Sequence, residues 1–148
     1  YKCNMTDLQA AIGLAQMKRY DGILARRREL IGRYDAALKP EGVEVLEHFT
    51  EKDCSSGHLY LTRLPGRSRE TCNEIITRMA EQGVATNVHY KPLPLLTAYR
   101  NLGFQIEDYP NAYAQFACEI TLPLHTCLTD EQQAYVIECY LEASRKIG

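Results

Sequence analysis

The chain has 148 residues, of which 45% are hydrophobic and 24% are charged, and this balance is typical of a globular domain with its own core. The formal net charge of −2 argues against nucleic acid as the main partner, because phosphate binding calls for a positive excess. No apolar run approaches the roughly 18 residues of a membrane span, and the first ten residues hold no apolar signal core. We therefore expect a cytoplasmic protein with neither nucleic acid nor membrane among its partners.

The six cysteines do not form the pattern of a metal site. None is separated from another by two residues and no histidine clusters with them, so we expect no bound metal. Cys72 and Cys139 fall on the apolar faces of expected helices, where a free thiol behaves as a small hydrophobic side chain. We expect all six to be reduced thiols, as in a cytosolic protein.

The first expected element is a helix of more than thirty residues. It begins at a capping box, in which the side chains of Thr6 and Gln9 each accept the other's backbone N–H. Apolar residues then recur at helical spacing up to Pro40, which disfavours helix at the residue before it. A bend is expected near Asp21-Gly22. Because this length exceeds what a small domain needs, we interpret residues 1–38 as a segment that joins this domain to another domain or subunit.

Residues 39–148 are expected to form a small α+β domain. Short strands are predicted at 42–46, 57–64, 84–90 and 119–124, and helices are predicted after Ser68, over 111–117 and after Thr129. Two of the strands follow each other without a helix between them, which argues against a doubly wound sheet. We expect a small, mainly antiparallel sheet with helices packed on one face.

The expected strand at 84–90 carries the most informative polar residues. Val84 and Val88 share one face and are predicted in the core, while Asn87 and His89 share the other face, which need not be buried. A histidine near a strand is more often a hydrogen-bonded structural residue than a catalyst, and we favour that interpretation for His58. For His89 both interpretations stay open.

Little else in the chain indicates chemistry, because it contains no phosphate loop, no GxSxG and no metal-ligand pair at helical spacing. Since the chain does not begin with Met, we expect it to be a piece of a longer polypeptide. The residues alone indicate an α+β domain that belongs to something larger.

Five segments extend this interpretation when they are taken together. Sugar aminotransferases of the DegT/DnrJ/StrS family contain, in the same order and spacing, the segments YKCNMTDLQAAIGLAQM, GHLY, VHYKPLPLL, DYPNAY and ITLPLHTCLTDEQ. The chain resembles the C-terminal small domain of such an enzyme, together with the long helix that joins it to the large domain. The resemblance implies the aspartate-aminotransferase fold and a homodimer in which both subunits build each active site.

The resemblance also implies a cofactor and a reaction. These enzymes bind pyridoxal 5′-phosphate (PLP) and move an amino group, usually from glutamate, to a nucleotide-linked keto sugar, in the biosynthesis of cell-surface glycans or cell-wall polysaccharides. Their Schiff-base lysine lies in the large domain, upstream of the segment that corresponds to Tyr1. None of the lysines here has the required setting. We therefore expect no catalytic lysine in this chain, no PLP bound to it and no activity from it alone.

Two groups of site residues follow from the resemblance. Lys2 and Asn4 align with residues that precede the long helix, where relatives carry an Asn that contacts the PLP phosphate of the neighbouring subunit; here either residue could take that role. His89, Tyr90 and Lys91 align with a loop near the nucleotide sugar at the mouth of the active site, and we expect them to bind substrate.

Three further residues match the family's pattern. Pro92 and Pro94 would hold the loop that follows His89 in one shape and reduce the entropy lost on binding. His125 also matches, with a role either at the site or in turning the chain into the last helix. The competing hypothesis is a regulatory α+β domain that senses a ligand or dimerises through the long helix and has no catalytic function.

Overall fold

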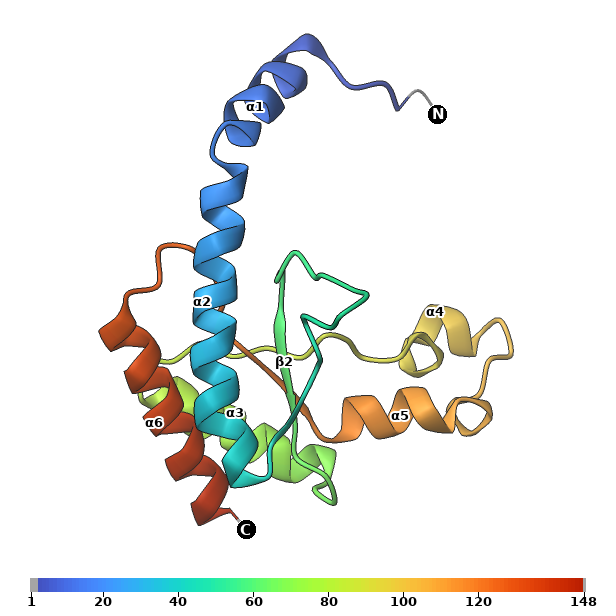
Figure 1. Cartoon of the computed structure of the whole chain (residues 1–148). Helices are drawn as coiled ribbons and strands as arrows, with labels where there is room; N and C mark the ends of the chain where they lie inside the picture. The colour runs from blue at the N-terminus through green and yellow to red at the C-terminus, as the bar shows by residue number, and fades with distance from the viewer. Residues whose placement is uncertain (1–2, 148) are drawn as a thin grey trace.

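Three short strands pair in chain order into one antiparallel sheet in the computed structural model, which describes residues 3–147 (Figure 1). The strands are β1 (Glu44–Val45), β2 (Tyr60–Arg63) and β3 (Glu119–Leu122). In the register of the central pair, Tyr60 lies opposite Leu122 and Thr62 lies opposite Ile120. All four side chains are buried, so they define the face of the sheet that meets the core.

Three helices cover this face: α2 (Tyr20–Leu38), α3 (Arg69–Glu81) and α6 (Asp130–Lys146). The ring of Tyr34 on α2 stacks on that of Tyr60, with 4.6 Å between the centroids. The hydroxyl of Tyr140 on α6 lies 2.8 Å from Oγ1 of Thr62. The predicted α+β architecture, with a small antiparallel sheet and helices packed on one face, is confirmed.

Local sequence signals set the helix ends as predicted. Thr129 and Gln132 form a capping box at the start of α6, and Ser68 accepts the backbone N–H of Thr71 at the start of α3. After α3 the chain turns at Gly83, whose φ of 76° is the left-handed conformation that favours glycine.

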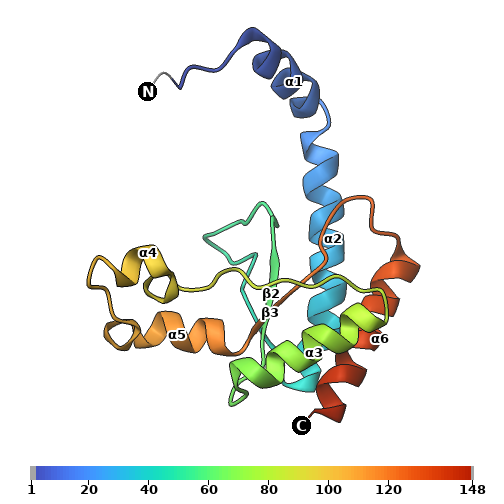
Figure 2. The same cartoon turned by 180° about the vertical axis from the view of Figure 1, so that it is seen from behind.

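The expected N-terminal helix is divided into two. Helix α1 (Asp7–Met17) is separated from α2 at Lys18-Arg19, and not at the predicted bend near Asp21-Gly22. At the break, the backbone N–H of Arg19 donates to the carbonyl of Gln16 at 2.9 Å, a tight turn in place of an α-helical bond. Since α1 has no buried residue, no packing holds it in line with α2, and it projects away from the sheet (Figures 1 and 2).

The predicted strand at 84–90 is wrong as a regular strand. The segment makes one bridge to the outer edge of β3, in which Asn87 and Thr121 exchange backbone hydrogen bonds of 3.1 and 2.8 Å. The next two N–H groups are taken by side chains: that of Val88 donates to Oδ1 of Asn87, and that of His89 donates to Oε2 of Glu119. Val84 is in the core as predicted, but Val88 is only half-buried.

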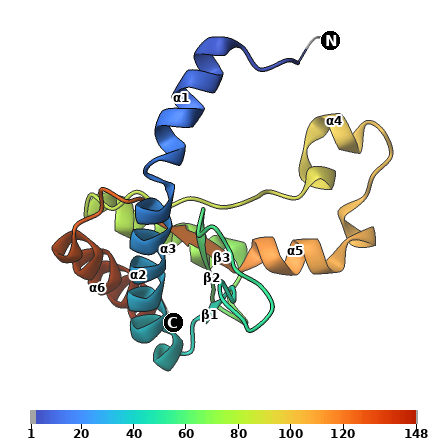
Figure 3. The ribbon, with the colours of Figure 1, turned by 45° about the horizontal axis from the view of Figure 1, so that its top comes forward.

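The remaining elements are short. They are the 3₁₀ helices η1 (Lys39–Glu41), η2 (Leu93–Leu95) and η3 (Ile106–Asp108), and the helices α4 (Thr97–Arg100) and α5 (Pro110–Ala117). Figure 3 shows α4 and α5 extending to one side of the sheet, away from α2 and α6. Within residues 3–147, no helix is both long enough and apolar enough to cross a membrane.

We expect the backbone amides of α1 to exchange hydrogen much faster than those of α2 from Leu30 to Leu38. Helix α1 has 11 residues and buries none of them, and isolated helices shorter than about 12–15 residues are marginal in water. Hydrogen exchange with mass spectrometry on the 148-residue chain measures this. Equal protection of both segments, in a chain shown by sedimentation to be monomeric, would contradict the expectation.

Candidate functional site

The segment that carries the predicted substrate residues lies against the outer edge of β3, and His89 is fixed there at two points. Its backbone N–H donates to Oε2 of Glu119 at 3.0 Å. Its ring Nδ1 lies 2.9 Å from Oγ1 of Thr121. The residue is half-buried, so part of it stays accessible to solvent.

Glu119 and Thr121 are not among the predicted site residues, although they hold His89. They alternate with Ile120 and Leu122 along β3, and therefore point away from the helix-covered face. Both are buried, Glu119 completely, and the Thr121 hydroxyl donates to Oε1 of Glu119. The signal available in the sequence was a glutamate and a threonine alternating with apolar residues in an otherwise apolar strand.

Burial is the main influence on the charge of Glu119, and it raises the pKa of the carboxyl group. Hydrogen bonds from the Thr121 hydroxyl and the His89 backbone act in the opposite direction, as does the positive charge of Arg69. Both carboxylate oxygens therefore have a donor, which a buried carboxylate needs.

Arg69, the first residue of α3, binds the backbone at the start of β3. It is 8% exposed, and its Nη1 donates to the backbone carbonyls of Phe116 and Glu119 at 2.7 and 2.8 Å. Its Nε donates to Oδ1 of Asn73, one turn along the helix, at 3.0 Å. The guanidinium thus joins α3 to the end of α5 and to the first residue of β3.

The other two predicted substrate residues point outward. Tyr90 is 71% exposed and its ring lies edge-on to that of His89, with 4.5 Å between the centroids. Lys91 is exposed as well, whereas Pro92 and Pro94 are buried. The three predicted residues are therefore adjacent, with the histidine anchored and its two neighbours free to meet a ligand.

The predicted cofactor residues are less defined. Lys2 lies outside the described residues, and Asn4 is exposed in the segment before α1.

Two other histidines of the sequence analysis are exposed. His58, for which we favoured a structural role, is one of them. His125 is also exposed, and its carbonyl accepts the N–H of Leu128 in the turn that leads to α6.

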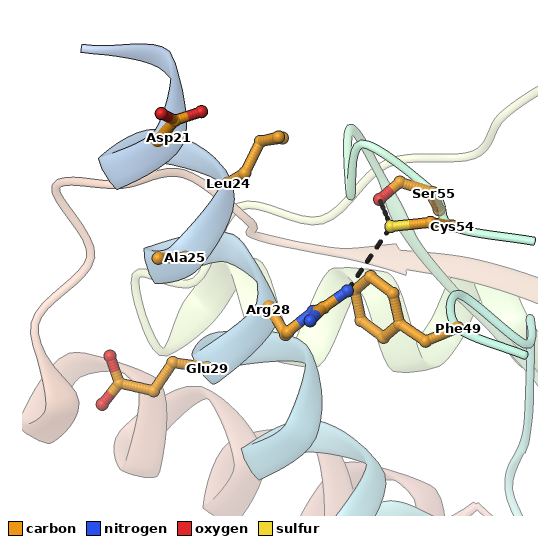
Figure 4. A pocket seen from close by; sticks show the side chains of 8 residues that line it. All are labelled: Asp21, Leu24, Ala25, Arg28, Glu29, Phe49, Cys54 and Ser55. Carbon is orange, nitrogen blue, oxygen red and sulfur yellow. Dashed lines mark hydrogen bonds between the residues drawn. The ribbon is translucent and has the colours of Figure 1, made fainter.

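A hollow on another part of the surface holds none of the predicted residues. It lies between α2 and residues 49–55, where Arg28 places its guanidinium 4.5 Å from the centre of the Phe49 ring (Figure 4). Nη2 of the same arginine lies 3.4 Å from Sγ of Cys54. No group of three or more metal-ligating side chains comes together within residues 3–147.

The described residues do not by themselves fit a PLP site. Every lysine from residue 3 to residue 147 is exposed, and Lys39 and Lys146 are engaged in ion pairs with carboxylates. A lysine that attaches PLP is normally held in a desolvated pocket. The contact predicted for Asn4 with the cofactor phosphate stays a prediction.

The model of the DegT/DnrJ/EryC1/StrS aminotransferase family matches residues 1–140. The chain belongs to this family. Among its relatives is the spore coat polysaccharide biosynthesis protein SpsC of Bacillus subtilis, which is 33% identical over 141 residues, covering 93% of this chain and 36% of that protein. A Helicobacter pylori UDP-4-amino-4,6-dideoxy-N-acetyl-beta-L-altrosamine transaminase is 31% identical over 128 residues, covering 86% of this chain and 34% of that enzyme.

Solved structures of family members have the same fold. Spr1654 of Streptococcus pneumoniae, which is described as a sugar aminotransferase, superimposes in its PMP form with a TM-score of 0.97 at 53% identity, covering 100% of this chain and 37% of that chain. Its PLP form gives a TM-score of 0.96 at the same identity. The predicted fold class is thus confirmed. The chain spans little more than a third of the length of these relatives.

Replacing Arg69 with Met should lower the free energy of unfolding by about 2–4 kcal/mol, because it leaves a buried and a partly buried carbonyl group without this donor. Urea denaturation of the 148-residue chain measures the change. Arg100→Met is the control: this arginine is exposed, and we expect an effect within about 0.5 kcal/mol. Equal effects of the two substitutions would show that the Arg69 contacts do not stabilise the fold.

Proposed function

We propose that this chain is part of a PLP-dependent aminotransferase that moves an amino group from glutamate to a nucleotide-linked keto sugar. The supporting observation is the 53% identity, over the whole chain, with a sugar aminotransferase that has been solved in both PLP and PMP forms. The name of the Bacillus relative supports a role in making a cell-surface or cell-wall polysaccharide. The reaction would take place in the cytoplasm.

Residues 1–38 would join the small domain, residues 39–148, to a large domain upstream that carries the Schiff-base lysine. Exposed apolar side chains on and beside α1 support this division, since such a surface is usually covered by another domain or subunit. They are Met5, Leu8, Ile12, Leu14 and Met17, each at least 65% exposed. The complete enzyme would be a homodimer, as the resemblance implies.

Within that enzyme, this chain would contribute to the edge of the active site. His89, Tyr90 and Lys91 would contact the nucleotide sugar or the amino donor, and the anchoring of His89 to β3 supports this role because it fixes the ring before a ligand arrives. Either Lys2 or Asn4 would contact the phosphate of the cofactor. PLP, when bound, carries the amino group between donor and acceptor.

The 148-residue chain alone should not attach PLP stoichiometrically at any one lysine, because each described lysine is exposed to water and none is held in a desolvated pocket. The test is to incubate the chain with PLP, reduce the mixture with borohydride and locate any added mass by peptide mass spectrometry. The complete enzyme, treated in the same way, should gain one modification on one lysine upstream of Tyr1. Stoichiometric modification of a single lysine within the 148 residues would refute this assignment.

In the complete enzyme, His89→Ala should lower kcat/KM by roughly ten- to a hundredfold, equivalent to about 1.4–2.7 kcal/mol. The loss of folding stability should be small, because the histidine is only half-buried. Steady-state kinetics and thermal melting measure the two effects.

Val84→Ala is the matched control, because Val84 lies in the same segment and is 5% exposed. We expect it to lower the free energy of unfolding by roughly 1.5 kcal/mol, from the two buried methyl groups that are lost, while the kinetics stay near normal. If instead His89→Ala lowered the melting temperature and left kcat/KM unchanged, the substrate role of His89 would be abandoned, and a non-catalytic role for the domain would gain support.

A further inference from the structure

A buried chain of hydrogen bonds connects Glu119, Thr121 and the ring of His89. An ionised carboxylate can only accept hydrogen bonds. Its Oε2 accepts the backbone N–H of His89 at 3.0 Å, and its Oε1 accepts the hydroxyl of Thr121. Both oxygens of Glu119 are therefore used by donors whose positions are fixed by β3 and by the segment beside it.

With Glu119 ionised, the form that its two donors and the nearby charge of Arg69 favour, this arrangement determines where His89 carries its proton. The hydroxyl of Thr121 has one hydrogen, and that hydrogen is directed at Glu119. Toward the imidazole, Oγ1 of Thr121 can then only accept, so the Nδ1 atom 2.9 Å away must be the donor. In the neutral ring, Nδ1 is protonated and Nε2 has a free lone pair.

The Nε2 atom is available to a ligand. Among the described residues, no hydrogen bond involves Nε2 of His89, and this nitrogen is not one of the buried unpaired side-chain atoms. A free lone pair accepts a hydrogen bond from a hydroxyl or an amine, and it repels the anionic oxygens of a phosphate or carboxylate.

We propose that Glu119 and Thr121 are positioning residues that hold His89 in the Nδ1–H form, so that Nε2 accepts a hydrogen bond from a hydroxyl group of the sugar substrate. The choice of ligand rests on the proposed function. It assigns His89 to the sugar ring, and neither to the diphosphate of the nucleotide nor to the carboxylates of glutamate. The proton position itself rests on the geometry of β3 alone.

The test uses the complete enzyme with histidine labelled with ¹⁵N in the ring, studied by magic-angle-spinning NMR. The ¹⁵N shifts report which ring nitrogen carries the proton and whether the ring is neutral, and His89→Gln assigns the signals. In the neutral ring of the wild type, Nδ1 should be protonated and Nε2 should not. A wild-type spectrum with the proton on Nε2 overturns the proposal without any further variant.

Glu119→Gln should move the proton. The oxygen of the new amide must face the backbone N–H of His89, since two donors cannot pair there. The amide nitrogen then faces Thr121 and donates to Oγ1, so the hydroxyl of Thr121 turns and donates to Nδ1. The proton of His89 should accordingly appear on Nε2. A neutral ring that keeps its proton on Nδ1 in this variant would count against the hydrogen-bond chain from Glu119 through Thr121 to His89.

Thr62→Val is the matched control. Thr62 is a buried threonine of the neighbouring strand, on the opposite face of the sheet, and its Oγ1 bonds the carbonyl of Ile120 and the hydroxyl of Tyr140. Its replacement should destabilise the protein and leave the His89 proton on Nδ1. Thr121→Val removes the hydroxyl that connects Glu119 to His89. Without this acceptor at Nδ1, the proton of the neutral ring should move to Nε2. A shift in the Thr62 variant equal to that in the Thr121 variant would show a general loosening of the sheet and would overturn the proposal.

Kinetics separate this proposal from the proposed function. Glu119→Gln should lower kcat/KM by roughly three- to tenfold, the loss of about one neutral hydrogen bond. In the double variant, Glu119→Gln should add little to the loss that His89→Ala already causes. If the NMR result holds but His89→Ala leaves kcat/KM unchanged, the proton position stands and the ligand assignment fails. If Glu119→Gln and His89→Ala lower kcat/KM additively, Glu119 does not act through His89 and its positioning role is wrong.

Discussion

The central constraint in this structure is that β3 is buried on both faces. Ile120 and Leu122 point toward the helices and belong to the hydrophobic core, while Glu119 and Thr121 point the opposite way, toward His89. Because successive residues of a strand alternate between faces, four consecutive residues serve both purposes. The position of the candidate site therefore depends on the packing of the core: any shift of β3 against β2 moves Glu119, and with it the ring of His89.

A fully buried glutamate is expensive to maintain unless its charge is compensated. Here the compensation comes from two hydrogen bonds to the carboxylate and from Arg69, whose guanidinium reaches the backbone at the same residue. Arg69 also binds the end of α5, so the helix that leads into β3 and the strand itself are held by one side chain. The paired groups of this network favour one local geometry, although Nη2 of Arg69 is buried and has no partner among the described residues.

The N-terminal part of the chain behaves in the opposite way. The core ties α2 to the sheet through Tyr34 and Leu38, but α1 extends beyond the body and has no buried residue (Figure 3). The chain spans little more than a third of the length of its relatives. The proposed large domain or second subunit would supply the surface that covers α1. The break at Lys18-Arg19 therefore separates a helix that packs on the core from one that does not.

The sequence by itself determined the features that arise from local chemistry and periodicity. Capping residues and apolar spacing placed α3 and α6, alternation placed β2 and β3, and ordered motifs along the chain identified the family. The motifs also directed attention to His89, which the structure anchors. These signals are readable because they depend on residues close together in the chain.

Tertiary structure alone decided the rest. The segment at 84–90 alternates as a strand does, yet side-chain acceptors on Asn87 and Glu119 take the N–H groups that would have continued the ladder. Glu119 lies thirty residues from His89, and nothing local indicates that its carboxylate meets that histidine. The bend in the N-terminal helix was predicted three residues too late; the break separates α1, which buries no residue, from α2, whose buried residues begin at Leu30. The contacts of His89 with Glu119 and Thr121 join groups that are distant in sequence, and only the folded chain brings these groups together.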